Sequence, residues 1–191
     1  MGKATVSGRS KTNTFAYMRI GAKQMLEQAT QTEIGQLYNI ISCLTFSAFM
    51  LEAYLNHFGK LRDENWDEIE RKYSKLQKYK QFCQECGLKY NLNKRPYSTM
   101  IELFTFRDCM AHGKSSIDYI KKEIEFDSEM PNRFTVGPEW KEYATLENAE
   151  KAIQDIEAII LELHAAGNFT GNVFNDLGGG IFGVRRHETQ Q

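Results

Sequence analysis

The sequence predicts an all-α fold, a four- to five-helix bundle, on three observations. The 191 residues are 41% hydrophobic and 26% charged, a composition typical of a globular domain. They include only three prolines, and a chain with so few prolines can form long uninterrupted helices. Apolar residues recur at steps of three and four positions in several long segments, as on the buried face of a helix. One domain suits this length, since a domain usually takes about 100–200 residues.

Both ends of the chain are expected to lie outside the helical domain. Residues 1–13 are rich in Gly, Ser, Thr and Lys and lack the apolar core of a signal peptide, which predicts a disordered N-terminus and a cytoplasmic protein. Residues 168–191 contain the run Gly178–Gly180 and end in polar residues, which predicts a flexible C-terminal tail. The helical domain is therefore expected over residues 14–167.

The first part of this domain is expected to hold two helices. About residues 14–30 carry an apolar stripe at helical spacing. The segment Glu33–Leu61 has no charge over the 18 positions between Glu33 and Glu52, close to the roughly 20 apolar residues of a membrane span. Because it also contains Gly, Ser, Thr, Asn and Gln, we interpret it as a core helix, apolar on two faces and ending at Gly59.

A third helix is expected over roughly residues 66–87, with Gly87 at its C-terminal end. Pro96 is suited to the first turn of a fourth helix, because its fixed backbone angle matches the helix. This fourth helix is expected to continue to about His112, just before Gly113. It carries the residues from which a function is inferred below.

The periodicity is lost over about residues 115–145. Apolar residues there surround a polar loop that contains Pro131 and Asn132, which fits either a small β-hairpin or an irregular insertion. A last helix is expected over about residues 146–166, where apolar residues again recur at helical spacing before Gly167.

The charges are unevenly distributed although the chain has a net charge of only −1. From Arg71 to Lys122 there are 12 Lys and Arg against 4 Asp and Glu, and from Glu123 to Gln191 there are 5 against 13. The basic segment Arg71–Lys122 is either a set of solvated helix faces that attract the acidic segment or a surface for phosphate groups. Both interpretations stay open from the sequence.

The fourth helix places an arginine in an unusual position. On a helical wheel, Arg107 lies within the apolar arc of the helix, and a buried guanidinium needs a partner, a ligand or an interface. Asp108 and His112 lie one turn apart, so the carboxylate could orient the imidazole. Alternatively, Arg107 pairs with Asp108 or another acid, and His112 only stabilises the helix end. A two-fold dimer would bring two copies of Arg107 and His112 into one cleft.

The run Arg107-Asp-Cys-Met-Ala-His112, followed by Gly113, resembles the Arg-x4-His signature of HEPN (higher eukaryotes and prokaryotes nucleotide-binding) domains. The polar residue after the arginine, here Asp108, is part of that signature. Glu52 and Asn56 resemble the acidic residue and asparagine of a long helix in the same family, and the likeness covers roughly residues 14–166. It implies an α-helical bundle and a homodimer with a shared site.

The resemblance also implies cleavage of RNA without a metal or other cofactor. The 2′-hydroxyl would attack the adjacent phosphorus, leaving a 2′,3′-cyclic phosphate and a 5′-hydroxyl. His112 would transfer protons, Arg107 would stabilise the phosphate charge and Asp108 would orient His112. Glu52, Asn56 and Lys114 are the expected substrate-binding residues.

Family members of this kind act as toxins, in phage defence or in RNA processing, which implies RNA, a second copy and an antitoxin or regulatory protein as partners. Lys114 stands where toxins that are paired with nucleotidyltransferase antitoxins carry a modified tyrosine, so that mode of neutralisation is not expected. The alternative is a catalytically inactive HEPN module for dimerisation, nucleotide binding or regulation of a partner protein.

The cysteines do not form a recognisable metal motif. Cys83 and Cys86 have the spacing of metal ligands, but a structural zinc site needs four ligands and the sequence has only one such pair. We therefore interpret Cys43, Cys83, Cys86 and Cys109 as ordinary thiols in a reducing compartment.

Overall fold

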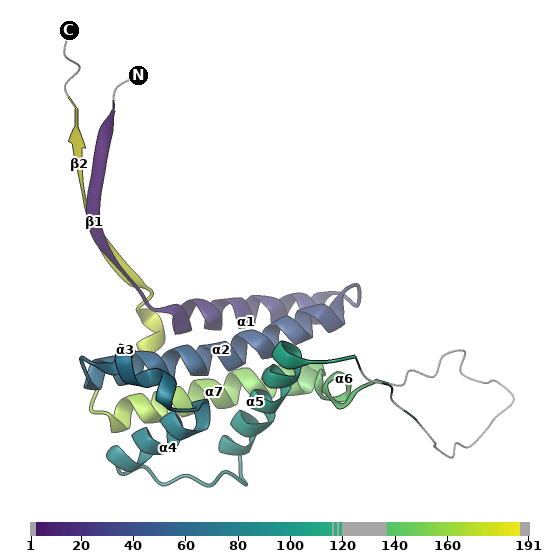
Figure 1. The fold of residues 1–191 in the computed structure, drawn as a ribbon. Helices are drawn as coiled ribbons and strands as arrows, with labels where there is room; N and C mark the ends of the chain where they lie inside the picture. The colour runs from purple at the N-terminus through teal and green to yellow at the C-terminus, as the bar shows by residue number, and fades with distance from the viewer. Residues whose placement is uncertain (1–2, 116, 118, 120–136, 188–191) are drawn as a thin grey trace, which may run out of the picture. The chain divides into compact units, whose positions relative to one another are not determined.

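The computed structural model describes residues 3–115, 117, 119 and 137–187 and is mostly helical, with one two-stranded sheet (Figure 1). The long helices are α1 (Thr14–Gln31), α2 (Gln36–Arg62), α5 (Tyr97–His112) and α7 (Leu146–Ala166). The shorter helical elements are α3 (Trp66–Ile69), η1 (Glu70–Lys72), α4 (Lys75–Glu85), α6 (Glu139–Tyr143) and η2 (Val173–Asn175). The strands are β1 (Ala4–Thr12) and β2 (Gly178–Arg186). The prediction of a helical fold is confirmed.

The chain divides into two compact units, and each is described by itself. Unit 1 comprises Met1–Ile20, Phe49–Lys89 and Ile160–Gln191. Unit 2 comprises Gly21–Ala48 and Tyr90–Ile159. The predicted site residues Arg107, Asp108, His112 and Lys114 belong to unit 2, whereas Glu52 and Asn56 belong to unit 1.

The core of unit 1 is largely aromatic. The rings of Phe15 and Tyr54 meet edge to face with centroids 5.4 Å apart, and Phe82 lies 5.0 Å from Phe58 and 5.3 Å from Trp66. Such edge-on and tilted pairs add a favourable quadrupole interaction to the burial of apolar area. Together these rings fix the second half of α2 against α4 and the start of α1.

Gly59 has a different role from the helix stop that the sequence predicts. Helix α2 continues past it to Arg62, so that prediction is wrong. The indole of Trp66 lies directly against Gly59, where any Cβ atom would collide with the ring. Gly59 is therefore required for close packing of the indole on the helix.

Helix α2 combines the length and the mean hydropathy of a membrane span with the burial of a core helix. It is long and apolar enough to cross a bilayer by length and composition alone. Its apolar residues Leu44, Ala48, Leu51, Leu55 and Phe58 are nevertheless completely buried within the protein. Tyr38, in the first turn of α2, and Ile34, just before the helix, are exposed.

The expected third helix is interrupted near its middle. In place of one helix over residues 66–87, the chain forms α3 and η1 and then restarts at Ser74. The Ser74 side chain accepts from the backbone N–H of Gln77, and the Gln77 side chain accepts from the backbone N–H of Ser74 at 2.8 Å. This capping box defines the start of α4. Gly87 follows α4 in the left-handed conformation (φ 69°), as predicted for its end.

The two chain ends differ most from expectation. Instead of a disordered N-terminus over residues 1–13 and a flexible tail over 168–191, β1 and β2 pair as an antiparallel ribbon, from Ala4 opposite Arg186 to Thr12 opposite Gly178. At the base of the ribbon, the buried Asn13 donates its backbone N–H to Leu177 and its side-chain amide to the Asp176 carbonyl. The two strands pair across almost the whole length of the chain, so no local pattern in the sequence indicates the pairing.

The hairpin or irregular insertion expected over residues 115–145 falls largely outside the described residues. The described residues continue from 137, and Pro138 immediately precedes the short helix α6. The last expected helix is confirmed, because α7 spans residues 146–166.

Candidate functional site

Helix α5 carries most of the predicted site. Its first three turns bury Thr99, Met100, Leu103, Phe104 and Phe106. Its last turn is different, since Cys109, Ala111 and His112 are exposed. The helix is thus anchored at its N-terminal end and presents its C-terminal turn to solvent.

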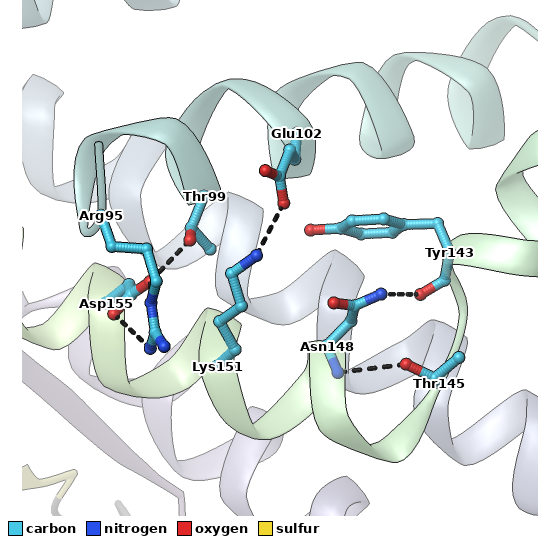
Figure 2. Close-up of polar contacts among 8 residues, drawn as sticks. All are labelled: Arg95, Thr99, Glu102, Tyr143, Thr145, Asn148, Lys151 and Asp155. Carbon is cyan, nitrogen blue, oxygen red and sulfur yellow. Dashed lines mark hydrogen bonds and ion pairs between the residues drawn. The ribbon is translucent and has the colours of Figure 1, made fainter. Parts of the chain in front are cut away.

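A buried carboxylate on α7 holds the N-terminal end of α5 (Figure 2). Asp155, only 7% exposed, accepts from Nε and Nη2 of Arg95 at 2.8 and 2.9 Å and from the Thr99 hydroxyl at 2.5 Å. One turn earlier on α7, Lys151 lies 3.0 Å from Glu102 of α5. The bidentate pair between Arg95 and Asp155 orients both side chains and is stronger than a single hydrogen bond.

Tyr143, at the end of α6, packs beside this network. Its ring centroid lies 5.5 Å from that of Phe106, and Asn148 donates to its backbone carbonyl at 2.8 Å. The Tyr143 hydroxyl is buried and has no hydrogen-bond partner among the described residues, and Figure 2 shows it on the side of Glu102 and Lys151. Burial raises the pKa of Tyr143, so the hydroxyl stays protonated and can donate a hydrogen bond.

Arg107 pairs with its neighbour in the chain. Nη1 of Arg107 lies 2.9 Å from Oδ1 of Asp108, and the arginine side chain is only 22% exposed. The predicted partial burial of the guanidinium is thus observed. The predicted contact of Asp108 with His112 is not: the His112 side chain makes no hydrogen bond within the described part of the chain.

Three of the predicted site residues line one hollow beyond the end of α5. This hollow, of about 550 Å³, is bordered by Asp108, His112 and Lys114, and its remaining walls are Thr105, Cys109, Gly113, Pro138 and Trp140. Its volume is within the range of small-ligand sites. His112 and Lys114 therefore border the same space, whereas Arg107 is not one of its lining residues and contacts one of them, Asp108.

A second hollow of about 340 Å³ adjoins the first and was not foreseen from the sequence. Both are lined by Thr105, Cys109 and Trp140. The second adds the aromatic rings of Phe106 and Tyr143, and its other walls are Ile101, Glu102 and Glu139. Aromatic walls with hydrogen-bond acceptors suit a flat ring that carries N–H groups.

Glu52 and Asn56 lie on one face of α2 in unit 1, next to α4. Oδ1 of Asn56 accepts from Nζ of Lys78 at 2.6 Å, and Oε1 of Glu52 lies 4.0 Å from Nζ of Lys75. Partial burial lowers the pKa of Lys78. The predicted approach of Glu52 and Asn56 to Arg107 would join the two units and stays a prediction.

The cysteines behave as separate thiols in the described chain. Burial raises the pKa of Cys43 to about 12 and that of Cys83 to about 11. Cys86 is half-buried, and Cys109 is exposed. Among the described residues, no three His, Cys, Asp or Glu side chains are grouped so that they could hold a metal ion.

Comparison of the chain with protein-family models, with curated proteins and with solved structures finds no match. The role of this site is therefore inferred from its own residues and geometry.

Proposed function

We propose that this protein is a HEPN-type endoribonuclease that cleaves RNA without a metal ion, with His112 and Arg107 at the reacting phosphodiester. The observation that supports this proposal is the hollow at the end of α5, where His112 and Lys114 face one space beside the Arg107–Asp108 pair. Proton transfer and charge stabilisation are the two tasks of RNA cleavage by its own 2′-hydroxyl, and these residue types perform them.

In the proposed reaction, the 2′-oxygen forms a bond to phosphorus while the bond to the 5′-oxygen breaks. An imidazole accepts the proton of the 2′-hydroxyl, and the departing 5′-oxygen takes up a proton from an imidazolium. Histidine is suited to both steps because it exchanges protons near neutral pH. In the proposed homodimer, one His112 from each copy would supply the base and the acid.

Arg107 would stabilise the negative charge that develops on the phosphate oxygens. A guanidinium presents several N–H donors in one plane, and in this structure Nη1 of Arg107 bonds to Asp108. The bond to Asp108 also holds the guanidinium in one orientation before the substrate binds. A charge that is already oriented stabilises the transition state without having to reorganise during the reaction. Asp108 is thus a positioning residue for Arg107 in this proposal, instead of the orienting partner of His112.

The adjoining aromatic hollow favours RNA over a simple phosphate ester as the substrate. Trp140 and Tyr143 offer surfaces on which a base can stack next to the scissile phosphate, and Glu102 and Glu139 offer acceptors for its N–H groups. The proposed setting is the cytoplasm, in a toxin, defence or RNA-processing role controlled by an antitoxin or regulatory protein.

A second candidate function is a catalytically inactive HEPN module that binds a nucleotide or regulates a partner protein. The Arg107–Asp108 ion pair favours it, because the carboxylate partly neutralises the charge that catalysis needs. The two candidates share a site and differ in whether a bond is broken.

The test is cleavage of a 5′-labelled RNA of about 30 nucleotides by purified protein in excess chelator. The nuclease proposal requires products that end in a 2′,3′-cyclic phosphate, and their loss in both His112→Ala and Arg107→Ala. Gln28→Ala is the matched control, since Gln28 is an exposed residue of α1 in the same unit. Cleavage that persists in both site variants would show that the site is wrong. Wild-type protein that binds a nucleotide but cuts nothing would support the inactive module.

A further inference from the structure

The β1–β2 ribbon concentrates positive charge. The described residues Lys3–Thr12 and Gly178–His187 contain no Asp or Glu, although the whole chain has 25 acidic and 24 basic residues. Their basic residues are Lys3, Arg9, Lys11, Arg185 and Arg186. Every residue of the two strands is exposed except the half-buried Gly178. Lys11 is ion-paired with Asp176 at the base of the ribbon, with Nζ and Oδ2 3.3 Å apart. The other four charges are presented to solvent along a strand pair about 30 Å long.

The strand register separates the ribbon into two faces. Residues directly opposite one another on antiparallel strands point to the same side. One face therefore carries the pairs Thr5–Arg185, Ser7–Gly183, Arg9–Ile181 and Lys11–Gly179. The other face carries the pairs Ala4–Arg186, Val6–Val184, Gly8–Phe182 and Ser10–Gly180. We name the first of these the cationic face.

The opposite, mainly apolar face keeps the strands together. The Phe182 ring lies over Gly8 and Gly180, where a Cβ atom would collide with it. Val6 pairs with Val184, yet both remain about two-thirds exposed (64% and 67%). An isolated two-stranded sheet is only marginally stable in water, so a ligand bound along the ribbon would stabilise it.

The cationic face also has a hollow with the donors that a phosphate requires. It has a volume of about 810 Å³ and is lined by Thr5, Ser7 and Arg185 of the cationic face and by His187. Arg186, which the register assigns to the opposite face, completes the lining. Oγ1 of Thr5 and Nε2 of His187 are hydrogen-bonded at 2.8 Å, which fixes both side chains at its edge. Gly183, opposite Ser7, has no side chain, which leaves room over that strand for a phosphate.

We propose that the cationic face of the ribbon binds the sugar-phosphate backbone of RNA. The choice of RNA rests on the proposed function, whereas the ribbon itself is separate in sequence from the predicted site residues. Charge complementarity favours a polyanion over a second copy of the ribbon, because two cationic faces, whose strands contain no Asp or Glu, would repel one another. The ribbon would supply affinity for the backbone without reading the sequence.

The test is fluorescence anisotropy with a labelled RNA of about 30 nucleotides, with His112→Ala in every protein so that no RNA is cut. The ribbon variant is Arg9→Gln/Arg185→Gln/Arg186→Gln, which removes two arginines of the cationic face and Arg186, which lines the hollow. The control variant Lys23→Gln/Lys60→Gln/Lys151→Gln removes the same charge from lysines that are already paired with carboxylates. We expect the ribbon variant to bind at least about tenfold more weakly and its salt slope to fall by about 2, while the control stays within about twofold.

Equal binding by the ribbon variant and the control, whether both are strong or both are weakened, would overturn this proposal. Unchanged RNA binding together with loss of the dimer in sedimentation would also overturn it, and would identify the ribbon as an interface between copies. Helical circular dichroism of the ribbon variant checks that the bundle is intact. If the ribbon variant loses RNA binding but the protein with His112 intact cuts no RNA, the nuclease proposal fails and the ribbon proposal stands. If the protein cuts RNA but binding does not depend on the ribbon, the ribbon proposal fails and the nuclease proposal stands.

Discussion

Arg107 donates a hydrogen bond to Asp108, the next residue in the chain, with Nη1 and Oδ1 2.9 Å apart. This pair leads to a first prediction, that Asp108→Asn lowers cleavage through Arg107 and leaves proton transfer by His112 unchanged. The amide keeps the shape of the side chain but loses the charge that orients the guanidinium. We expect the rate under single-turnover conditions to fall about tenfold, with the same pH profile as wild type.

The pH profile separates the two roles that Asp108 could have. If the carboxylate instead orients His112, Asp108→Asn would shift the pH at which the cleavage rate is half-maximal. Such a shift would contradict the role assigned here. Asp108→Glu serves as the conservative control, because it keeps the charge and should retain more activity than Asp108→Asn.

A second prediction concerns Asp155, whose carboxylate accepts from Arg95 and Thr99 at the N-terminal end of α5. Asp155→Asn exchanges a buried charged acceptor for an amide and is expected to lower the free energy of unfolding by about 1–3 kcal/mol. Urea denaturation measures this change. Glu102→Gln is the control, since the Glu102 side chain is 41% exposed against 10% for Asp155, and its ion pair with Lys151 should contribute less than about 1 kcal/mol. Equal effects of the two variants would contradict a special role for Asp155.

The parts of the fold that the sequence predicts well are those with local signals. Helix α7 has a regular apolar stripe and a glycine after it, and its bounds agree with the prediction. Helix α5 also has local signals at both ends, because it begins directly after Pro96 and ends directly before Gly113. The ribbon depends on pairing between the two chain ends, and Gly59 depends on the position of Trp66, so neither could be predicted from local patterns.

Three of the residues that the sequence singles out, Asp108, His112 and Lys114, line one hollow, but the surroundings of that hollow were not predictable. The position of Arg107 in an apolar arc correctly indicated a partly buried guanidinium. Its partner remained open because Asp108 could reach either Arg107 or His112. Trp140 and Tyr143 come from a short helix within a region without clear periodicity, so only the tertiary structure reveals that they wall the neighbouring hollow.

A third prediction is that the stability of unit 1 decreases as the pH falls from 7 to 5. The buried His164 packs on Phe169 and is hydrogen-bonded to the Tyr54 hydroxyl at 3.2 Å, and His57 packs on Phe15. Burial lowers the pKa of both histidines, and for His57 the nearby Lys11 lowers it further. The unfolded chain, whose histidines titrate near about 6.5, therefore binds more protons than the folded protein in this range.

Stability from these two groups is fully present above about pH 6.5 and is lost as the pH falls toward their folded-state pKa values. Urea denaturation at half-unit intervals measures the effect. His164→Gln should flatten part of the slope and His57→Gln/His164→Gln most of it. A wild-type free energy of unfolding that is constant or higher at pH 5.5 than at pH 7 would disagree with this assignment.

A fourth prediction uses Cys109, which is exposed and lines both hollows. Alkylation by N-ethylmaleimide at pH 7.5 should modify Cys109 well before Cys43 and Cys83, because burial hides those thiols and raises the pKa of each. The added group would occupy the space in front of His112, so cleavage should be lost as Cys109 is modified, and bound RNA should slow the reaction. Mass spectrometry of peptides identifies the site, and Cys109→Ser should keep its activity under the same treatment. Full modification of Cys109 with undiminished cleavage would show that RNA does not pass through these hollows.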